Sequence, residues 1–193
     1  IGQIVICWIL TPLGSAIMTM LIYPLIRSIF ATRIAKKCEK PLIIFLIHIT
    51  SAYLAFSWGA NDVANATGIL IGTGRVSSEL AAFIGGIAIT IGVITWGYKV
   101  IRTVGGKITS LTNTRGFSVD FSAATVVLAA SKLGLPISTT HVVVGAVVGV
   151  GLARGLAAID LSIIKRIVLS WLLTLPATII TSILIYIGLS IIF

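Results

Sequence analysis

The sequence predicts an all-α polytopic membrane protein, and three observations carry that prediction. Of the 193 residues, 58% are hydrophobic and only 10% are charged. A soluble domain would carry roughly a quarter of its residues as charged side chains. Several apolar runs reach the ~20 residues that an α-helix needs to cross a bilayer. Short polar segments separate these runs, and we interpret them as loops at the two membrane surfaces.

The formal net charge of +9 follows from this topology. In a soluble protein such a charge would suggest a nucleic-acid partner. Here the basic residues gather between the apolar runs, for example Arg33, Lys36, Lys37 and Lys40. The positive-inside rule places such loops in the cytoplasm. We therefore expect a lipid bilayer and no nucleic acid as the surroundings of the chain, with multi-pass insertion in the cell (plasma) membrane.

Four long apolar segments are predicted to span the bilayer as helices. They cover about residues 4–30, 41–71, 80–98 and 163–193. Prolines inside the first of them are expected to kink it. The second, 41–71, is expected to be broken near Gly59, because glycine admits unwound backbone. A polar, basic stretch follows the third span up to residue 120.

Residues 121–153 are predicted to form a re-entrant helical hairpin. Its first piece, 121–133, would be only ~20 Å long at ~1.5 Å per residue, short of a ~30 Å hydrocarbon core. A second short piece, 137–152, follows directly after Pro136. With a hairpin here, the strongly basic loops all fall on one side of the membrane. A full crossing would instead place Arg154 on the outer side.

A polar cluster lies inside the second span, where Asn61, Asp62 and Asn65 follow one another closely. A carboxylate at bilayer depth is costly, so it should face a partner, a cavity or an ion. Amide and carboxylate oxygens suit an alkali cation. A bound Na⁺ or a proton would also relieve repulsion between Asp62 and an anionic substrate, which favours symport. An ion pair between Asp62 and a basic residue is the alternative.

A second polar cluster consists of Ser138, Thr139, Thr140 and His141, directly after Pro136. Proline is favoured at a helix start, and free N–H groups and hydroxyls there can bind an oxyanion. His141 could support the loop or carry a proton. Buried hydroxyls in membrane helices also bond their own backbone, and the isolated His48 fits a packing role.

Two function classes other than transport remain open at this point. An intramembrane hydrolase would need a nucleophile with a base, and Ser138 with His141 is the only candidate pair. No further carboxylate in the motif would orient the histidine. A receptor-like sensor would bind an anion without net flux.

Two motifs resemble the signatures of the inorganic phosphate transporter (PiT) family. These are GANDVANA at residues 59–66 and PISTTH at residues 136–141. The resemblance continues through 96–98, 115–118 and 151–155, and it covers nearly all of the chain. Members of this family are symporters, not enzymes, and couple phosphate entry to Na⁺ or H⁺ by alternating access. They contain two inverted repeats, each with one copy of both signatures, around a shared substrate site.

The resemblance implies that residues 1–193 form the carboxy-terminal repeat of such a symporter. The phosphate-binding residues that it implies are Asn61, Asp62, Asn65, Ser138, Thr139 and Thr140. Asp62 and Asn65 are also candidate Na⁺ ligands, and no cofactor is expected beyond the coupling ion.

The chain departs from the family pattern in two ways. Residues 67–69 read Thr-Gly-Ile, where many carboxy-terminal copies have an apolar residue and then Gly-Pro. Only one copy of each signature is present, so the missing amino-terminal repeat is either cut away, a separate chain, or replaced by a second copy in a homodimer. A carrier of sulfate or another tetrahedral oxyanion is the alternative function. Asp62 favours phosphate, because phosphate retains a proton that a carboxylate can accept.

Overall fold

The computed structural model describes residues 2–31 and 33–192, and for residues 3, 4, 31, 33–40, 191 and 192 it describes the backbone alone. The side chains of the basic residues predicted to form a loop therefore lie outside the described ones, namely Arg33, Lys36, Lys37 and Lys40, and the backbone of residues 33–40 is helical rather than a loop. Throughout the described ranges every regular element is helical. Four segments are long and apolar enough to cross a membrane, namely Val5–Phe30, Pro41–Gly72, Ser78–Gly106 and Leu161–Ser190. The all-α polytopic prediction is thus confirmed.

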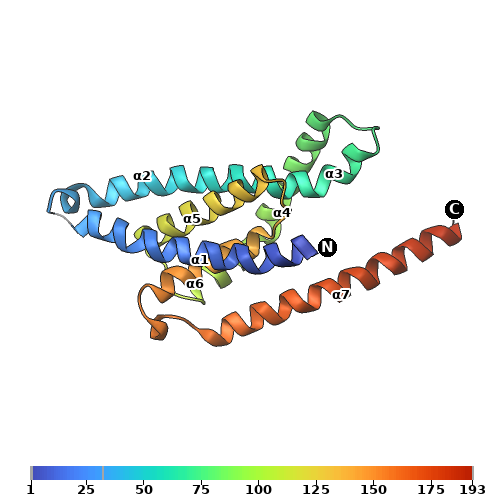
Figure 1. Ribbon diagram of the computed structural model, residues 1–193. Helices are drawn as coiled ribbons and strands as arrows, with labels where there is room; N and C mark the ends of the chain where they lie inside the picture. Colours follow the sequence, from blue (N-terminus) through green and yellow to red (C-terminus); the bar gives the residue numbers. More distant parts are fainter. Residues whose placement is uncertain (1, 32, 193) are drawn as a thin grey trace. The chain divides into compact units, whose positions relative to one another are not determined.

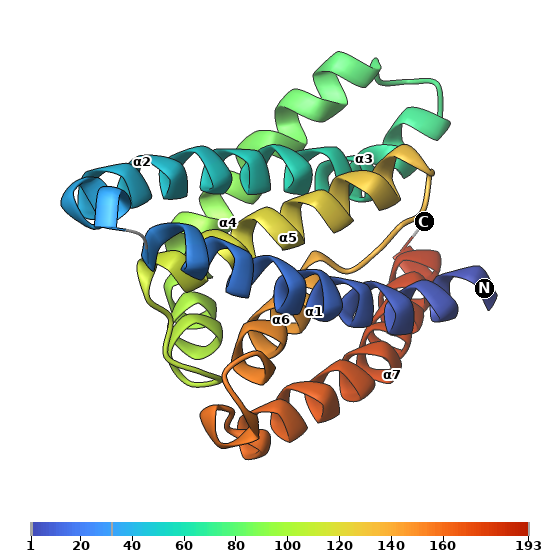
Figure 2. The same cartoon turned by 60° about the vertical axis from the view of Figure 1, so that its left-hand side comes forward.

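The chain divides into two compact units, Ile1–Ile159 and Asp160–Phe193. In the first unit, α1 (Gly2–Ala31) and α2 (Arg33–Trp58) run antiparallel, with α5 (Asn113–Lys132) beside both (Figures 1 and 2). Helix α6 (Thr139–Leu152) packs on α1 and α5. The start of α6 is thereby brought to the middle of the bundle.

The interruption expected near Gly59 takes the form of a π-helical segment, Gly59–Val63. It joins α2 to α3 (Ala64–Gly72), so the second span stays helical along its whole length. Single π-helical turns inside α-helices are frequent at functional sites. Helix α4 (Ser78–Gly106) packs on α3. Ser77 caps its start, because the Ser77 side chain accepts a hydrogen bond from the Leu80 N–H at 3.3 Å.

Helix α5 begins earlier than the sequence predicted, at Asn113 instead of residue 121. The polar residues 113–120 continue the helix, because it buries Ser118 and Val119 on one face. With 20 residues α5 reaches ~30 Å. The length argument for a re-entrant hairpin therefore holds only for α6, with 14 residues. The hairpin over 121–153 stays a prediction.

The turn after α5 is closed by a Schellman motif around Gly134. The backbone φ of Gly134 is +67°, a conformation that glycine adopts without strain. Leu135 N–H donates to the Ala130 carbonyl at 3.0 Å, and Gly134 N–H donates to the Ser131 carbonyl at 3.0 Å. This turn leads the chain into the extended residues before α6.

Small side chains make up much of the core of the first unit. Ala123, Ala124 and Val127 of α5 are fully buried, as is Val142 of α6. Several buried hydroxyls bond their own helix, as expected: the Thr19 hydroxyl, for example, donates to the Ser15 carbonyl at 2.8 Å. Such residues let membrane helices approach closely.

The second unit is the single helix α7 (Leu161–Ile192), which continues through Pro176. Asp160 caps its start. One carboxylate oxygen, Oδ1, accepts hydrogen bonds from the Ser162 hydroxyl at 2.6 Å, from the Ser162 N–H at 2.9 Å and from the Ile163 N–H at 3.3 Å. The Ser162 side chain first, and then the Ile163 N–H, hold the pKa of Asp160 below its usual range.

We expect Gly149→Ala to destabilise the packing of α6 on α1. A Cβ atom at Gly149 would lie 2.7 Å from the Ala16 Cα, so one helix would have to move. Such overpacking lowers the free energy of unfolding by about 1–3 kcal/mol. Gly92→Ala in α4 is the matched control, because nothing lies within 4 Å of its added Cβ. Thermal unfolding in detergent measures both, and equal midpoints would contradict the close approach.

Candidate functional site

Asn61 joins the second span to the residues before α6. The side chain is buried, with 3% of its surface exposed. Its Nδ2 donates to the Ile137 carbonyl at 3.0 Å, and its Oδ1 accepts from the Ile137 N–H at 3.4 Å. The same Nδ2 donates to Asp62 Oδ1 at 2.7 Å. The Asn61 amide thus contacts both the Asp62 carboxylate in the π-helical segment and the backbone just before α6. The second contact joins residues that are 76 positions apart in the sequence.

Asp62 is half-buried and accepts a hydrogen bond at each carboxylate oxygen. Oδ1 accepts from Asn61, and Oδ2 accepts from the Thr139 hydroxyl at 2.8 Å. Each oxygen keeps a second lone pair that can bind a cation or accept a proton. Among the described side chains, the partners of Asp62 are an amide and a hydroxyl, with no lysine or arginine in ion-pair contact. The ion-pair alternative therefore has no support in this part of the chain.

The start of α6 leaves backbone donors for an anion. Ser138 caps the helix, because its Oγ accepts from the His141 N–H at 3.4 Å and its carbonyl accepts from the Val142 N–H at 3.2 Å. The N–H groups of Thr139 and Thr140 have no acceptor among the described residues. They lie at the positive end of the helix dipole, a ready site for an anion. The exposed Thr140 hydroxyl adds a third donor.

The structure brings Asn61, Asp62 and Thr139 into direct contact, with Ser138 next to them in the chain. Asn65 is exposed, and in the described part of the molecule its side chain makes no hydrogen bond. It follows Asp62 by three residues, which places both on one side of the helix. A role for Asn65 as a phosphate or Na⁺ ligand stays a prediction.

The two histidines have separate surroundings. The His141 ring lies edge-on to Trp8 of α1, with ring centroids 6.4 Å apart at an angle of 72°. His48 Nδ1 lies 2.7 Å from the Ile44 carbonyl of its own helix, which agrees with a packing role. Because a carbonyl can only accept, that nitrogen carries the proton. The hydrogen bond between His141 and Ser138 is a helix cap through the backbone, not a pairing of a base with a nucleophile.

A second carboxylate, Asp120, was not among the predicted site residues. It is half-buried in α5, and its Oδ2 accepts from the Ser51 hydroxyl of α2 at 2.8 Å. Phe117 and Phe121 stack beside it, with centroids 6.2 Å apart. From the sequence, Asp120 was predicted to end a polar, basic stretch between two helices. The sequence signal that could have identified it is the helical spacing of the apolar residues Val119, Ala123 and Val127, all of them buried. This spacing places residue 120 inside a helix.

Comparisons with known proteins agree on one family. Residues 1–182 match the sequence profile of the phosphate transporter family. A candidate phosphate permease of Pyrococcus furiosus is 59% identical over 140 residues, which are 67% of this chain and 34% of that protein. A chloroplastic inorganic phosphate transporter of Arabidopsis thaliana is 47% identical over 141 residues, covering 66% of this chain and 24% of that protein.

A solved structure has the same fold. It is described as the sodium-dependent phosphate transporter, with a TM-score of 0.72 and 38% sequence identity. The alignment covers 90% of this chain and 62% of the solved chain. The chain spans about a third of the length of the curated relatives that it matches, between 34% and 38% for those from Pyrococcus and Chlamydia pneumoniae.

Proposed function

The chain belongs to the phosphate transporter family, and from this premise we propose that it forms part of a carrier that moves inorganic phosphate across a membrane together with Na⁺ or H⁺. The family consists of integral membrane transporters rather than enzymes. The observation that carries the proposal is the hydrogen bond from Thr139 to Asp62, 77 residues away. It brings a carboxylate, which can hold a cation, to a helix start that can hold an anion.

Phosphate would bind at the start of α6. The N–H groups of Thr139 and Thr140 and the Thr140 hydroxyl would donate to its oxygens in place of water. Ser138 would keep these donors in place as the helix cap. Asp62 would either accept a hydrogen bond from the O–H group of monobasic or dibasic phosphate or hold a cation beside it. Thr139 has a double role, because its hydroxyl proton points to Asp62 while its oxygen can still accept a hydrogen bond from phosphate.

The coupling ion would act through charge. Without a cation, Asp62 repels an approaching phosphate, and a bound Na⁺ or proton removes that repulsion. Na⁺ is favoured because Asp62 keeps free lone pairs, and Asn65 lies close by in sequence as a further oxygen ligand. The description of the solved relative as sodium-dependent supports the same choice. No cofactor beyond the coupling ion is needed.

Transport would require a second, complementary half. We place residues 1–193 as the carboxy-terminal repeat, with substrate bound between this repeat and an amino-terminal one. Rocking of the two repeats around the fixed site would alternate access between the two sides of the cell membrane. The partial coverage of the curated relatives supports a missing half, whether on the same polypeptide, a separate chain or a second copy.

The two threonines allow the proposed roles to be separated. We expect Thr140→Val to weaken phosphate binding by about 12- to 150-fold, the loss of one hydrogen bond to a charged group, with little change in Na⁺ dependence. Thr139→Val should raise the Na⁺ concentration needed for half-maximal uptake, because Asp62 loses the hydrogen bond that holds its Oδ2 atom in place. Thr90→Val in α4 is the control, since its hydroxyl donates only to the Gly86 carbonyl of its own helix. Unchanged phosphate affinity in both site variants would return these hydroxyls to a packing role.

Sulfate is the alternative substrate. It lacks the proton that phosphate can donate to Asp62 at neutral pH. Competition of labelled-phosphate uptake by sulfate and by arsenate distinguishes the two: inhibition by arsenate alone is expected. Equal inhibition by sulfate would move the substrate class to tetrahedral oxyanions in general.

A further inference from the structure

Two arginines meet at one hydroxyl at the far end of the first unit. Arg115, in the first turn of α5, donates from Nη1 to the Ser110 carbonyl at 2.7 Å and to Ser110 Oγ at 3.0 Å. Arg154, just after α6, donates from Nη1 to Thr109 Oγ1 at 3.1 Å and to Ser110 Oγ at 3.3 Å. Because α6 runs from the Asp62 site to this end over 14 residues, the arginine pair lies ~20 Å from that site.

Among the described side chains, no acidic group pairs with the two arginines at this end of the unit. Neither guanidinium has a carboxylate partner there, and two cations around one oxygen repel each other. Arg115 also lies at the positive end of the α5 dipole, an unfavourable place for a cation. Its Nε is buried and has no acceptor in the described part of the molecule. Arg154 lies just after α6, where the negative end of the helix dipole favours a cation. Arg115 has no such favourable interaction with a helix dipole.

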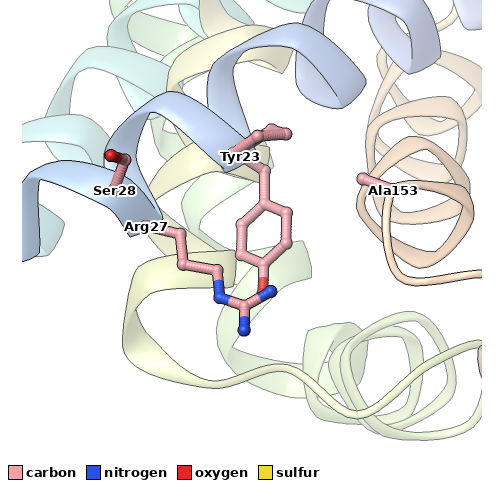
Figure 3. Close-up of a pocket in the computed structure, with 5 residues that line it drawn as sticks. Tyr23, Arg27, Ser28 and Ala153 are labelled. Atoms are coloured by element: carbon pink, nitrogen blue, oxygen red, sulfur yellow. The ribbon is translucent and has the colours of Figure 1, made fainter. Parts of the chain in front are cut away.

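A small pocket at the same end adds a third arginine. It has a volume of about 270 Å³ and is lined by Tyr23, Pro24, Arg27, Ser28 and Ala153. Figure 3 shows Arg27 extending along the Tyr23 side chain, with Ala153 on the other side. Ala153 directly precedes Arg154, so the end of α6 contributes one residue to the pocket and the next to the arginine pair. The Arg27 guanidinium and the Tyr23 hydroxyl, which lie next to each other in Figure 3, are hydrogen-bond donors suited to phosphate oxygens, whereas the Ser28 hydroxyl points away from them.

The position matches the surface of a membrane. The apolar spans Val5–Phe30 and Ser78–Gly106 both end here, Arg27 three residues before the end of the first. Lipid headgroups lie at the ends of spanning helices, and basic residues there attract anionic lipids. Arginine also binds phosphate through a planar fork that two oxygens can match.

We propose that Arg115 and Arg154, with Arg27 across the adjoining pocket, bind a phosphate group at the membrane surface. An anionic phospholipid headgroup and free inorganic phosphate both supply this chemistry. The bound group neutralises the arginine pair and ties together the end of α1, the loop before α5 and the end of α6. This site is separate from the transport site and does not depend on the proposed transport activity.

The test compares lipids in the full-length protein. Wild type, Arg154→Gln and Arg27→Gln are purified and placed in nanodiscs of phosphatidylcholine with or without phosphatidylglycerol. Arg75→Gln, in the exposed loop before α4, is the control with the same change of charge. We expect phosphatidylglycerol to raise the unfolding midpoint of wild type and control. Each site variant should bind this lipid roughly fivefold more weakly, and the rise in midpoint should shrink accordingly.

A second arm measures the binding stoichiometry of inorganic phosphate in phosphatidylcholine alone. If free phosphate is the ligand, the site variants lose one bound phosphate relative to the control, while the effect of phosphatidylglycerol is unchanged. Arg27 makes no hydrogen bond to the described residues, so Arg27→Gln tests the site without loosening the loop. If both site variants keep the lipid effect and the phosphate stoichiometry of the control, the proposal is overturned. The proposal is also overturned if the unfolding midpoint of a site variant falls by the same amount with and without phosphatidylglycerol. That result would mean that the arginines only stabilise the loop before α5.

Discussion

Asp62→Asn is expected to abolish cation-coupled phosphate uptake and to leave the fold intact. The amide has the shape of the carboxylate, and its oxygen can still accept the bond from Asn61. The Thr139 hydroxyl can turn and accept from the new amide nitrogen. The negative charge is lost, however, and with it the charge-assisted contact to a cation, worth about 2–3 kcal/mol or roughly 30- to 150-fold in affinity.

The matched control for this variant is Glu79→Gln, which removes a carboxylate that is exposed in the first turn of α4. Labelled-phosphate uptake into proteoliposomes, with an unfolding midpoint for each variant, gives both readouts. Near-wild-type uptake by Asp62→Asn would remove Asp62 from the coupling mechanism. A collapse of the midpoint would instead make its role structural.

Asn61→Asp should be the most damaging conservative change in the site. The new carboxylate has no N–H group, so the buried Ile137 carbonyl loses its donor. It would also face Asp62 Oδ1, which now lies 2.7 Å from the Asn61 nitrogen, with a like charge. Leaving the buried Ile137 carbonyl without a donor costs about 1–3 kcal/mol of the free energy of unfolding. The repulsion between the two carboxylates adds to this cost. We expect a large fall in the free energy of unfolding at neutral pH, together with loss of uptake.

Asn113→Asp is the control for this change, because Asn113 is exposed at the first position of α5, where a negative charge is favourable. Chemical denaturation in detergent compares the two variants. If Asn61→Asp and Asn113→Asp unfold at the same denaturant concentration, the amide does not hold the start of α6.

Most of the fold could be predicted because it depends on the lengths of apolar runs. The four spans follow directly from that signal. Their ends agree with the helices to within a few residues except at residue 41, because α2 already begins at Arg33, and at residue 98, because α4 continues to Gly106. The beginning of α5 could not be predicted in the same way. Residues 113–120 are polar in composition, and the apolar spacing of Val119, Ala123 and Val127 reaches back only to Val119, so the packing against neighbouring helices is needed to place the start of α5 at Asn113.

The candidate site was predictable in its residue types but not in its contacts. Asp62 and the hydroxyls after Pro136 stand out in an apolar sequence, because polar groups are costly there. The pairing of Asp62 with Thr139, and of Asn61 with Ile137, joins residues more than 70 positions apart and depends on tertiary structure. Asp120 was missed for a related reason, since its partner Ser51 is 69 positions away.

Uptake of labelled phosphate by the full-length protein in proteoliposomes tests the central claim most directly. Initial rates are compared under an inward Na⁺ gradient, an inward proton gradient and no gradient. We predict stimulation by the Na⁺ gradient, with loss of that stimulation in Asp62→Asn. Stimulation by protons alone would make Asp62 or His141 the proton carrier instead. Absence of phosphate uptake under both gradients would contradict the account of a cation-coupled phosphate carrier.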